Sequence, residues 1–596
     1  MIPSASRFLP GASAAAMFAM LLTVPAPAVH AQSQAMGEGW ALTRPERTDY
    51  RETTRYDEVV AYMQQMAAAN PKIHLTTYGY TYEGRALPLA VIGAPGASPE
   101  EVLATGKTRV YIQANIHGGE VEGKEAMLQM LRSIARGERD AWFESTVLLI
   151  NPIYNADGNE RINLTNRGSQ AGPFGGMGTR ENAQQLDLNR DGMKMETAEA
   201  RSMASLLTRY QPHVAMDLHT TDGSGNSGFN MTYETSLNPN NSKAEMDFLR
   251  EELLPLITKN VREKHGSYWW FYGGISGTGD NRAWRSDADL ARPRYTSTYF
   301  GVRNILGLLT EAYSYSPLKT RSEETYWFVE EVLDHVANNG PRIRALVDAA
   351  NKESVIGRQL AVRQELVRDP RLREIASAES RLVRHPYVPD RPYRVRTDEP
   401  ITTEMLPFYG MTEPTETSLA PRVWVIPNTP GSAAPAAPPA GAPGAPGGAP
   451  GFIPGQIPPG GGGFGFGPRG APFERLITTV RDRLDSHGVS YSVTTREVAF
   501  NGERYKIESN TLAPREYQGA HKARTLTGTW EGTQQTLPVG SLIIPMDQPL
   551  ARLLFILMDP RSDDGFMWWN ILDAVLGQTP APEYYPVFRS MNDIRG

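Results

Sequence analysis

The sequence predicts an α/β fold in its first half, with helices covering a largely parallel sheet, followed by a C-terminal α+β domain. Short apolar segments alternate with helical patterns, as they do when the strands of a parallel sheet are buried on both faces. The first strands are expected at residues 87–94, 109–117 and 146–153. His117, His219 and Glu311 stand at or near the ends of predicted strands, where open α/β sheets gather their ligands.

Length and composition limit the class of protein. A chain of 596 residues is long enough for two or more domains, and its 40% apolar and 21% charged residues are ordinary globular values. The formal net charge of −6, with both signs interspersed, predicts neither a nucleic-acid partner nor a polybasic membrane patch. The absence of cysteine excludes disulfides, thiolate metal sites and cysteine nucleophiles, so any metal must be held by histidines and carboxylates.

Residues 1–31 have the pattern of a secretory signal peptide. Arg7 precedes an apolar stretch at 12–24, and small residues occupy the −3 and −1 positions of a cut after Ala31. We therefore expect a secreted or periplasmic protein. No later segment approaches the roughly 20 consecutive apolar residues of a membrane span, so none is expected.

The remaining elements of the first half follow from hydrophobic periodicity and from helix-ending residues. Helices are expected at 53–70, 120–135, 196–210, 242–264 and 323–338, and further strands at 214–220 and 305–312. Gly266 marks the end of the fourth of these helices.

The composition and the hydrophobic pattern of the sequence change beyond about residue 350. We expect a charged helical stretch to about residue 384, then a proline-rich passage and a strand at 422–427. Between residues 428 and 472, 26 of 45 residues are glycine or proline, which predicts a disordered insertion. An amphipathic helix at 473–487, ended by Gly488, and a strand at 489–494 complete the predicted α+β domain, which covers residues 355–596.

His117-Gly118-Gly119-Glu120 follows a predicted strand, and two flexible glycines allow both outer side chains to turn toward one cation. Alone, this pattern is also typical of a surface histidine near a glutamate in the first turn of a helix. His219 ends another strand, two residues after Asp217, and alone it is also typical of a hydrogen-bonded edge residue. Together His117, Glu120 and His219 make the two-histidine, one-glutamate set with an open fourth position that catalytic zinc requires.

Glu311 lies at the mouth of a buried strand, where it is either a partly exposed turn residue or, beside a metal-bound water, a general base. Asn189 and Arg190 combine an amide with a guanidinium, a pair suited to binding a carboxylate, although a solvated loop is the plainer interpretation. Asp187 can orient a ligand imidazole by accepting its other ring proton.

The order of the motifs resembles the carboxypeptidase A/B-like zinc peptidases over about residues 45–345. The motifs are His117-Gly118-Gly119-Glu120, Asn151-Pro152 with Asn155-Ala156-Asp157-Gly158, Asp187-Leu188-Asn189-Arg190, Asp217-Leu218-His219 and Thr310-Glu311-Ala312. The resemblance implies a mixed, mostly parallel sheet flanked by helices, with a zinc ion as the cofactor.

Residue by residue, the resemblance implies zinc ligands at His117, Glu120 and His219, a general base at Glu311, and a binding pair for the substrate's terminal carboxylate at Asn189 and Arg190. An arginine that stabilises the oxyanion is also implied. Arg167 matches best, with Arg161 and Arg180 as alternatives. Tyr272, Tyr295 and Tyr299 are all candidates for the family's mobile tyrosine.

The function that follows from the resemblance is zinc-dependent hydrolysis of C-terminal peptide bonds, acting on peptides with a free C-terminus. A deacylase or amidohydrolase of the same fold is an alternative, because an acylated amino acid also presents a carboxylate. A degenerate, non-catalytic peptide-binding module is a second alternative. The C-terminal domain is assigned no chemistry.

Overall fold

The computed structural model describes residues 36–37, 39–221, 227–428 and 472–594. The expected signal peptide, residues 1–31, lies outside these residues, and so does nearly all of the expected insertion at 428–472. The chain divides into two compact units, up to Leu42 and from Thr43 onward. In the first, β1 (Met36–Gly37) pairs with β2 (Trp40–Ala41). The second unit contains every other element and is described below.

An eight-stranded sheet in the order β3-β4-β6-β5-β7-β12-β8-β9 occupies the centre of the first half of this unit. Its strands are β3 (Ile73–Tyr80), β4 (Ala86–Ile92), β5 (Thr108–Ala114), β6 (Thr146–Asn151), β7 (Val214–Thr221), β8 (Met231–Thr235), β9 (Trp269–Phe271) and β12 (Leu306–Tyr313). Strands β6, β5, β7 and β12 are parallel, whereas β4 and β8 run antiparallel to their neighbours in this group. The sheet is thus mixed and mostly parallel, as predicted, because its central strands are almost continuously apolar and buried on both faces.

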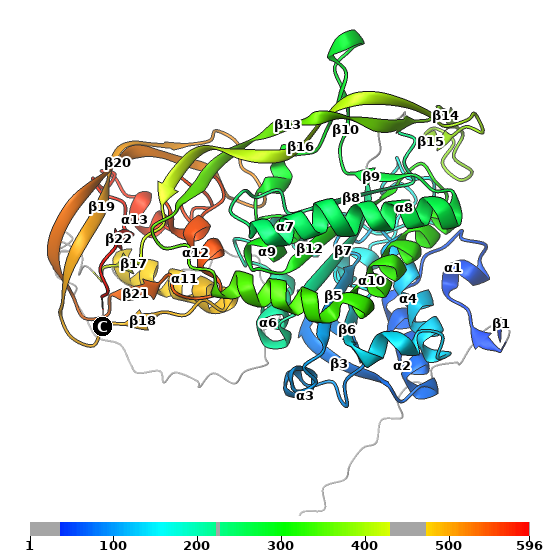
Figure 1. The fold of residues 1–596 in the computed structure, drawn as a ribbon, viewed down its shortest axis with the longest axis horizontal. Helices are drawn as coiled ribbons and strands as arrows, with labels where there is room; N and C mark the ends of the chain where they lie inside the picture. The colour runs from blue at the N-terminus through cyan, green and yellow to red at the C-terminus, as the bar shows by residue number, and fades with distance from the viewer. Residues whose placement is uncertain (1–35, 38, 222–226, 429–471, 595–596) are drawn as a thin grey trace, which may run out of the picture. The chain divides into compact units, whose positions relative to one another are not determined.

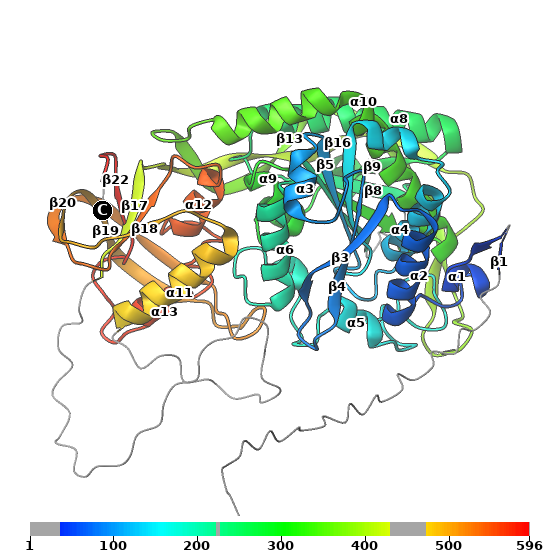
Figure 2. The same cartoon turned by 90° about the horizontal axis from the view of Figure 1, so that it is seen from below.

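Helices cover both faces of this sheet, and Figure 2 shows the strands between α6 and α9 on one side and α2 and α4 on the other. The helices are α2 (Tyr56–Ala69), α3 (Pro99–Ala104), α4 (Glu122–Ala135), α5 (Ala156–Glu160), α6 (Ala198–Tyr210), α7 (Lys243–Asp247), α8 (Leu254–His265), α9 (Thr296–Val302) and α10 (Leu318–Lys352), after the short α1 (Arg44–Arg47). The helix expected at 242–264 is α7, a π-helical turn (Phe248–Leu253) and α8, which ends at Gly266 with φ of 68°. No helix of the described residues has the length and apolarity needed to cross a membrane.

The prediction of a charged helix between residues 350 and 384 is wrong. This segment is β13 (Gln359–Ser377), paired antiparallel with β16 (Thr402–Leu419), and the tip holds β14 (Ser380–Val383) and β15 (Tyr393–Arg396). Helix-favouring residues are common in it, but the hydrogen-bond ladder with a strand some 40 residues later overrides local propensity. The hairpin extends from the C-terminal sheet toward β10 (Gly274–Ser276; Figure 1), where β16 pairs with β11 (Ala283–Arg285).

The C-terminal part is α+β, as predicted. A six-stranded sheet in the order β18-β21-β17-β22-β19-β20 packs with three helices. Its elements are β17 (Val423–Ile426), α11 (Pro472–His487), β18 (Ser492–Val493), β19 (Val498–Leu512), β20 (Arg524–Leu537), β21 (Leu542–Pro545), α12 (Ala551–Met558), α13 (Asp573–Leu576) and β22 (Phe588–Ser590). The helix expected at 473–487 is confirmed as α11, but the strand expected at 489–494 shortens to β18.

One continuous apolar core joins the two parts of this unit. It runs from Tyr111 of β5 through Leu207 of α6 and Phe300 of α9 to Val480 of α11 and Phe555 of α12. Burial of this shared surface holds the C-terminal part against α6 and α9. The proposed domain limits of 45–345 and 355–596 stay a prediction, and residue 345 itself lies inside α10.

Candidate active site and metal centre

The loop after β5 brings two ligands together because its backbone folds back on itself. Asn115 has a left-handed φ of 64°, and its side-chain Nδ2 donates to the carbonyl oxygens of His117, Gly118 and Glu120 at 3.0–3.2 Å. Position 119 requires glycine because the Arg167 side chain lies close to its backbone. A Cβ at this position would lie 2.6 Å from Arg167 Cγ. The two glycines predicted to give flexibility therefore also give space.

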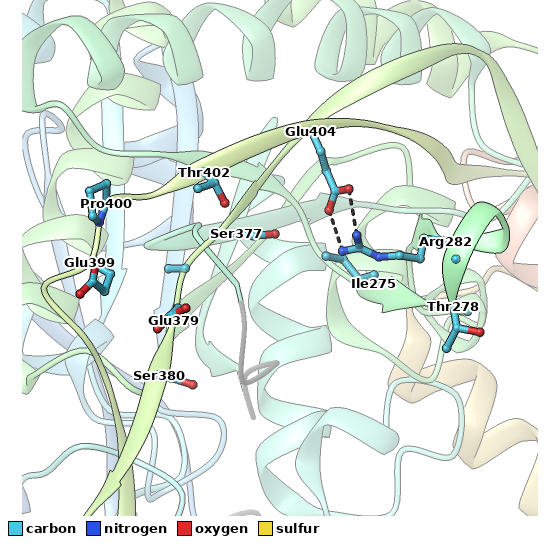
Figure 3. A pocket seen from close by; sticks show the side chains of 13 residues that line it. Ile275, Thr278, Arg282, Ser377, Glu379, Ser380, Glu399, Pro400, Thr402 and Glu404 are labelled. Atoms are coloured by element: carbon cyan, nitrogen blue, oxygen red, sulfur yellow. Dashed lines mark hydrogen bonds and ion pairs between the residues drawn. The ribbon is translucent and has the colours of Figure 1, made fainter.

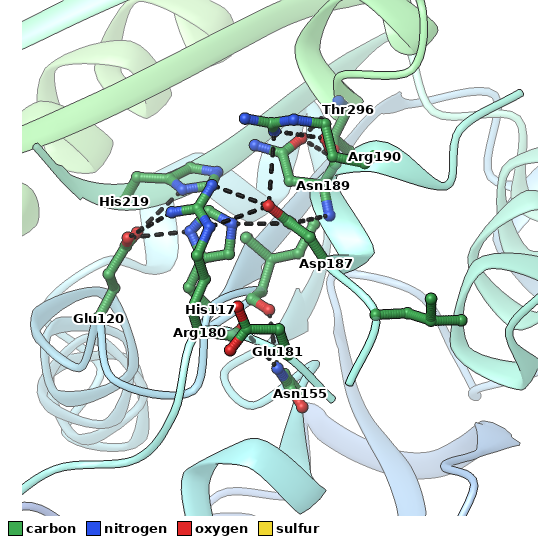
Figure 4. Close-up of polar contacts among 12 residues, drawn as sticks. His117, Glu120, Asn155, Arg180, Glu181, Asp187, Asn189, Arg190, His219 and Thr296 are labelled. Atoms are coloured by element: carbon green, nitrogen blue, oxygen red, sulfur yellow. Dashed lines mark hydrogen bonds and ion pairs between the residues drawn. The ribbon is translucent and has the colours of Figure 1, made fainter. Parts of the chain in front are cut away.

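His117, Glu120 and His219 form a compact, buried group (Figure 4). The Nδ1 atoms of the two histidines lie 2.9 and 3.0 Å from the two oxygens of Glu120, and one ligand atom from each residue lies within 4.8 Å of the others. Two neutral imidazoles and a carboxylate are the donors of a catalytic zinc site, and three protein ligands leave one position for water or substrate. The donor set therefore fits the predicted zinc ion.

Carboxylates on the outer side of both imidazoles hold the rings in this orientation. Asp187 Oδ1 lies 3.0 Å from His117 Nε2, as predicted, and Asp217 Oδ2 lies 2.9 Å from His219 Nε2. A carboxylate at Nε2 keeps the proton on that atom and directs the Nδ1 lone pair to a metal. Burial alone would raise the pKa of Asp187, but its contact with His117 and the charges of Arg190 and Arg180 hold this pKa well below its usual range.

The structure separates the three candidate arginines. Arg167 Nη2 donates to Glu120 Oε1 at 2.6 Å, which places its guanidinium at the metal centre. Arg180 is bonded to Asp187 at 2.9 Å and lies 3.9 Å from Glu120. Arg161 instead pairs with Glu83 on the surface. Arg167 and Arg180 therefore lie at the metal centre, and Arg161 lies apart from it.

Glu311 lies beside the ligand group without belonging to it. Strands β12 and β7 are parallel, and Glu311 is paired in register with His219, so both side chains leave the same face of the sheet. Glu311 is 9% exposed and, with Thr221 and Ser227, lines a small cavity. It is thus a carboxylate next to the metal centre that is open to a water-sized space.

Asn189 and Arg190 lie in a 3₁₀ turn (Leu188–Arg190) directly after Asp187. Asn189 Oδ1 accepts hydrogen bonds from the backbone N–H and the hydroxyl of Thr296, both at 2.9 Å, which aims the amide group (Figure 4). Arg190 Nη1 donates to the Asn189 carbonyl at 2.8 Å, and its guanidinium lies over the ring of Tyr295 at 3.9 Å. The predicted pair therefore lies in the same loop as a residue that touches a metal ligand.

The three candidate tyrosines differ in the structure. Tyr295 stacks on Arg190, and Tyr272 packs in the same small apolar cluster as Tyr295. Tyr299 is fully buried, and its hydroxyl contacts His487 Nδ1 at 2.9 Å and Arg303 at 3.0 Å. Tyr299 therefore faces the junction with the C-terminal part, whereas Tyr295 lies against Arg190.

Sequence reasoning missed two residues at this site. Tyr517 OH accepts a hydrogen bond from Arg190 Nε at 3.1 Å, and Gln518 Oε1 accepts one from the backbone N–H of Asp187, also at 3.1 Å. Both belong to the C-terminal part, to which the sequence assigned no chemistry. No local motif marks them, because their contacts reach across more than 300 residues.

A large cavity lies elsewhere, at the tip of the β13–β16 hairpin beside β10 (Gly274–Ser276). Its volume is about 1210 Å³, and the ion pair of Arg282 with Glu404, 2.6 Å long, crosses its wall (Figure 3). None of the predicted ligand or catalytic residues lines it. The size of a cavity therefore does not locate the metal centre in this protein.

Comparison with known proteins agrees with the site. Residues 59–279 match the family model described as zinc carboxypeptidase. Carboxypeptidase 2 of Trichophyton rubrum is 28% identical over 172 residues, which are 28% of each chain. Carboxypeptidase 2 of Trichophyton equinum is 27% identical over 196 residues, 32% of this chain and 33% of that protein. The matched segment thus spans about a third or less of the length of these relatives.

Among solved structures, a metallo-carboxypeptidase from Burkholderia cenocepacia aligns over 48% of this chain and 69% of its own, with 16% identity and a TM-score of 0.36. The family match and the buried group of His117, Glu120 and His219 confirm the prediction of a zinc site. Over residues 59–279 the chain is therefore similar to the zinc carboxypeptidase family.

Proposed function

We propose that this protein is an exported zinc metallocarboxypeptidase that removes residues from the free C-terminus of peptides. One observation carries the proposal. Asp187 lies between the metal centre and the carboxylate-binding pair, with Oδ1 3.0 Å from His117 Nε2 and Oδ2 3.8 Å from Arg190 Nη1. A single side chain thus holds the hydrolytic centre at a fixed separation from a cation suited to a terminal carboxylate.

The chemistry divides among a few side chains. Zinc, when bound, supplies Lewis-acid polarisation and acidifies a water molecule. Glu311 accepts a proton from the attacking water and returns it to the nitrogen of the leaving amine. Arg167, whose Nη2 already lies 2.6 Å from Glu120, donates hydrogen bonds to the negative oxygen that develops on the scissile carbonyl.

Selectivity for a chain end comes from Asn189 and Arg190. A guanidinium is always charged and meets a carboxylate with two parallel hydrogen bonds, and the Asn189 amide adds a further donor. An internal peptide segment has no carboxylate at this place. Binding at Arg190 therefore favours the last peptide bond over bonds inside the chain.

A pair of peptides tests the proposal. We expect the wild-type protein to hydrolyse a short peptide with a free C-terminus much faster than the same peptide with a C-terminal amide. Arg190→Ala should lower kcat/KM on the free peptide about 10-fold or more, since charge-assisted hydrogen bonds contribute about 1.5–3 kcal/mol. The matched control is Arg161→Ala, because Arg161 pairs with Glu83 away from the metal centre.

Two outcomes would contradict the carboxypeptidase. If Arg190→Ala lowers kcat/KM equally on the free and the amidated peptide while the zinc content is unchanged, Arg190 does not bind the terminal carboxylate. Faster turnover of N-acyl amino acids than of any peptide would instead favour a deacylase, which also needs a carboxylate-binding arginine.

Export rests on residues 1–31 and has its own test. If this segment is a signal peptide, expression in a bacterium with a secretory pathway should yield an exported protein whose N-terminal residue is Gln32. Recovery of the protein inside the cell with Met1 or Ile2 as its first residue would contradict export and leave the hydrolytic proposal untouched.

A further inference from the structure

We propose that Tyr517 is a positioning residue for Arg190, so that the C-terminal part of the chain completes the carboxylate-binding site. The inference rests on the proposed carboxypeptidase function. It assigns to the segment 513–523, which lies outside the matched family region, a role in recognising the substrate's chain end.

The segment 513–523 is a closed turn between β19 and β20. At its base the N–H of Ala513 donates to the carbonyl of Ala523 at 2.8 Å, and at its tip the N–H of Tyr517 donates to the carbonyl of His521, also at 2.8 Å. These two bonds give the turn a defined shape. Tyr517 is therefore presented by an ordered element that projects from the C-terminal sheet.

Three polar contacts anchor this turn to the loop that carries Arg190. Tyr517 OH accepts from Arg190 Nε at 3.1 Å, and Gln518 Oε1 accepts from the N–H of Asp187 at 3.1 Å. His521 Nε2 lies 2.7 Å from Glu196 Oε1, just before α6. The contacts fall on residues 187, 190 and 196, so the turn binds this loop along its length.

The contact with Tyr517 completes a frame around the Arg190 guanidinium. Its Nε bonds to Tyr517, its Nη1 bonds to the Asn189 carbonyl at 2.8 Å, and one face lies 3.9 Å from the ring of Tyr295. Two parallel hydrogen bonds to a carboxylate require the guanidinium and carboxylate planes to coincide. A phenol oxygen at Nε restricts rotation of that plane while leaving the positive charge unchanged.

Tyr517 is itself held by a cluster of aromatic rings. Its ring stacks on Trp569 at 5.9 Å and meets Trp568 edge-on at 6.1 Å. Arg294, whose backbone N–H and Nε both donate to Asp564, lies 4.1 Å above Trp568. The Trp568-Trp569 pair therefore supports a residue of the site in addition to filling a core. Tyr517 is nevertheless 36% exposed.

The decisive variant is Tyr517→Phe, which keeps the ring stacking and removes only the oxygen that accepts from Arg190 Nε. With the zinc-loaded full-length protein, we expect KM for a peptide with a free C-terminus to rise about 3- to 10-fold, the size of one lost hydrogen bond. We expect kcat, zinc content and melting temperature to stay near wild type. Turnover of the amidated peptide should not change.

Tyr584→Phe is a matched control. Tyr584 OH accepts from Arg504 at 2.9 Å, and the Arg504 guanidinium lies 3.6 Å over its ring, so the same kind of tyrosine–arginine contact is removed from the same sheet away from the site. This variant should leave KM for the free peptide unchanged. A purely structural effect of losing such a contact would affect both variants alike.

Calorimetry gives a readout that does not depend on hydrolysis. Titration of an N-acetyl amino acid into the protein should show a Kd that Tyr517→Phe weakens by the same 3- to 10-fold, whereas the corresponding amide ligand should show no dependence on Tyr517. If Tyr517→Phe leaves both KM and this Kd unchanged, or weakens carboxylate and amide ligands equally, the positioning role is wrong even where the carboxypeptidase is correct.

Failure of the proposed function has a different signature. A wild-type protein that hydrolyses no peptide, yet binds the N-acetyl amino acid with a Kd that depends on both Arg190 and Tyr517, would overturn the carboxypeptidase and support the carboxylate pocket. Carboxylate binding that is unaffected by Arg190→Ala would overturn both.

Discussion

Glu311 and His219 occupy paired positions on the adjacent parallel strands β12 and β7. Because side chains alternate along a strand, a register shifted by one residue would turn the Glu311 carboxylate to the opposite face, away from the metal centre. The hydrogen-bond register of the sheet therefore sets the position of Glu311 relative to the ligand His219.

We predict that Glu311→Gln keeps the metal and loses at least about 100-fold in kcat, since an amide cannot accept the proton of the attacking water. Metal analysis and steady-state kinetics check this. Glu331→Gln is the control, because Glu331 is also buried but accepts hydrogen bonds from Asn260 and Lys264 of α8. Turnover close to wild type in Glu311→Gln would assign the base to another group.

The purified protein should contain about one zinc ion per chain, as a site with three protein ligands requires. Removal of the metal by a chelator should abolish hydrolysis and lower the melting temperature, because a ligand that binds only the native state stabilises it. Elemental analysis and a thermal melt of both forms measure this. Full activity in a zinc-free sample would exclude the mechanism proposed for Glu311 and Arg167.

Gly119→Ala should separate Arg167 from the metal centre. The added Cβ would lie 2.5 Å from the carbonyl oxygen of Gly178 and 2.6 Å from Arg167 Cγ, so the loop at residue 119 and the Arg167 side chain must move apart. We expect kcat/KM to fall about 10-fold or more, since one donor to an oxyanion contributes at least that much. Gly168→Ala is the control, because a Cβ on Gly168 meets nothing within 4 Å. Equal activity in the two variants would argue against the role of Arg167.

Acid should weaken the fold through His213, which is 4% exposed and whose Nδ1 accepts a hydrogen bond from the N–H of Arg109 at 3.0 Å. Burial, together with the charges of Arg109 and Arg344, lowers the pKa of His213 to about 3. The unfolded state binds this proton at a higher pH than the folded state does. The contribution of neutral His213 to the free energy of unfolding is therefore complete above pH 6.5 and is lost as the pH falls toward 3.

The loss should be on the order of 3 kcal/mol in free energy of unfolding, measured by urea denaturation at a series of pH values. His213→Asn keeps an acceptor near Arg109 without a titrating group, so its stability should depend less on pH in this interval. An unchanged slope in His213→Asn would assign the acid sensitivity to other groups.

Much of the architecture followed from short-range pattern. The apolar strands β5, β6, β7 and β12, and the amphipathic helix α11 with its terminal glycine, were predicted because hydrophobic periodicity and end signals act over a few residues. The ligands His117 and Glu120 were predicted for the same reason, since their spacing is local. The hairpin β13–β16 was not, because its ladder joins segments about 40 residues apart and overrides helix propensity.

The sequence by itself determined which residue types are present for the chemistry. They are His117, His219 and Glu311 at or near the ends of strands, and Glu120 with the Asn189-Arg190 pair between the strands. Only the tertiary structure shows that Arg167 contacts Glu120 whereas Arg161 contacts Glu83, and only it places Tyr517 on Arg190 across 327 residues. A metal-ligand motif depends on neighbours along the chain. The surroundings of Arg190 depend on which surfaces the shared apolar core brings together, and that packing is a property of the whole fold.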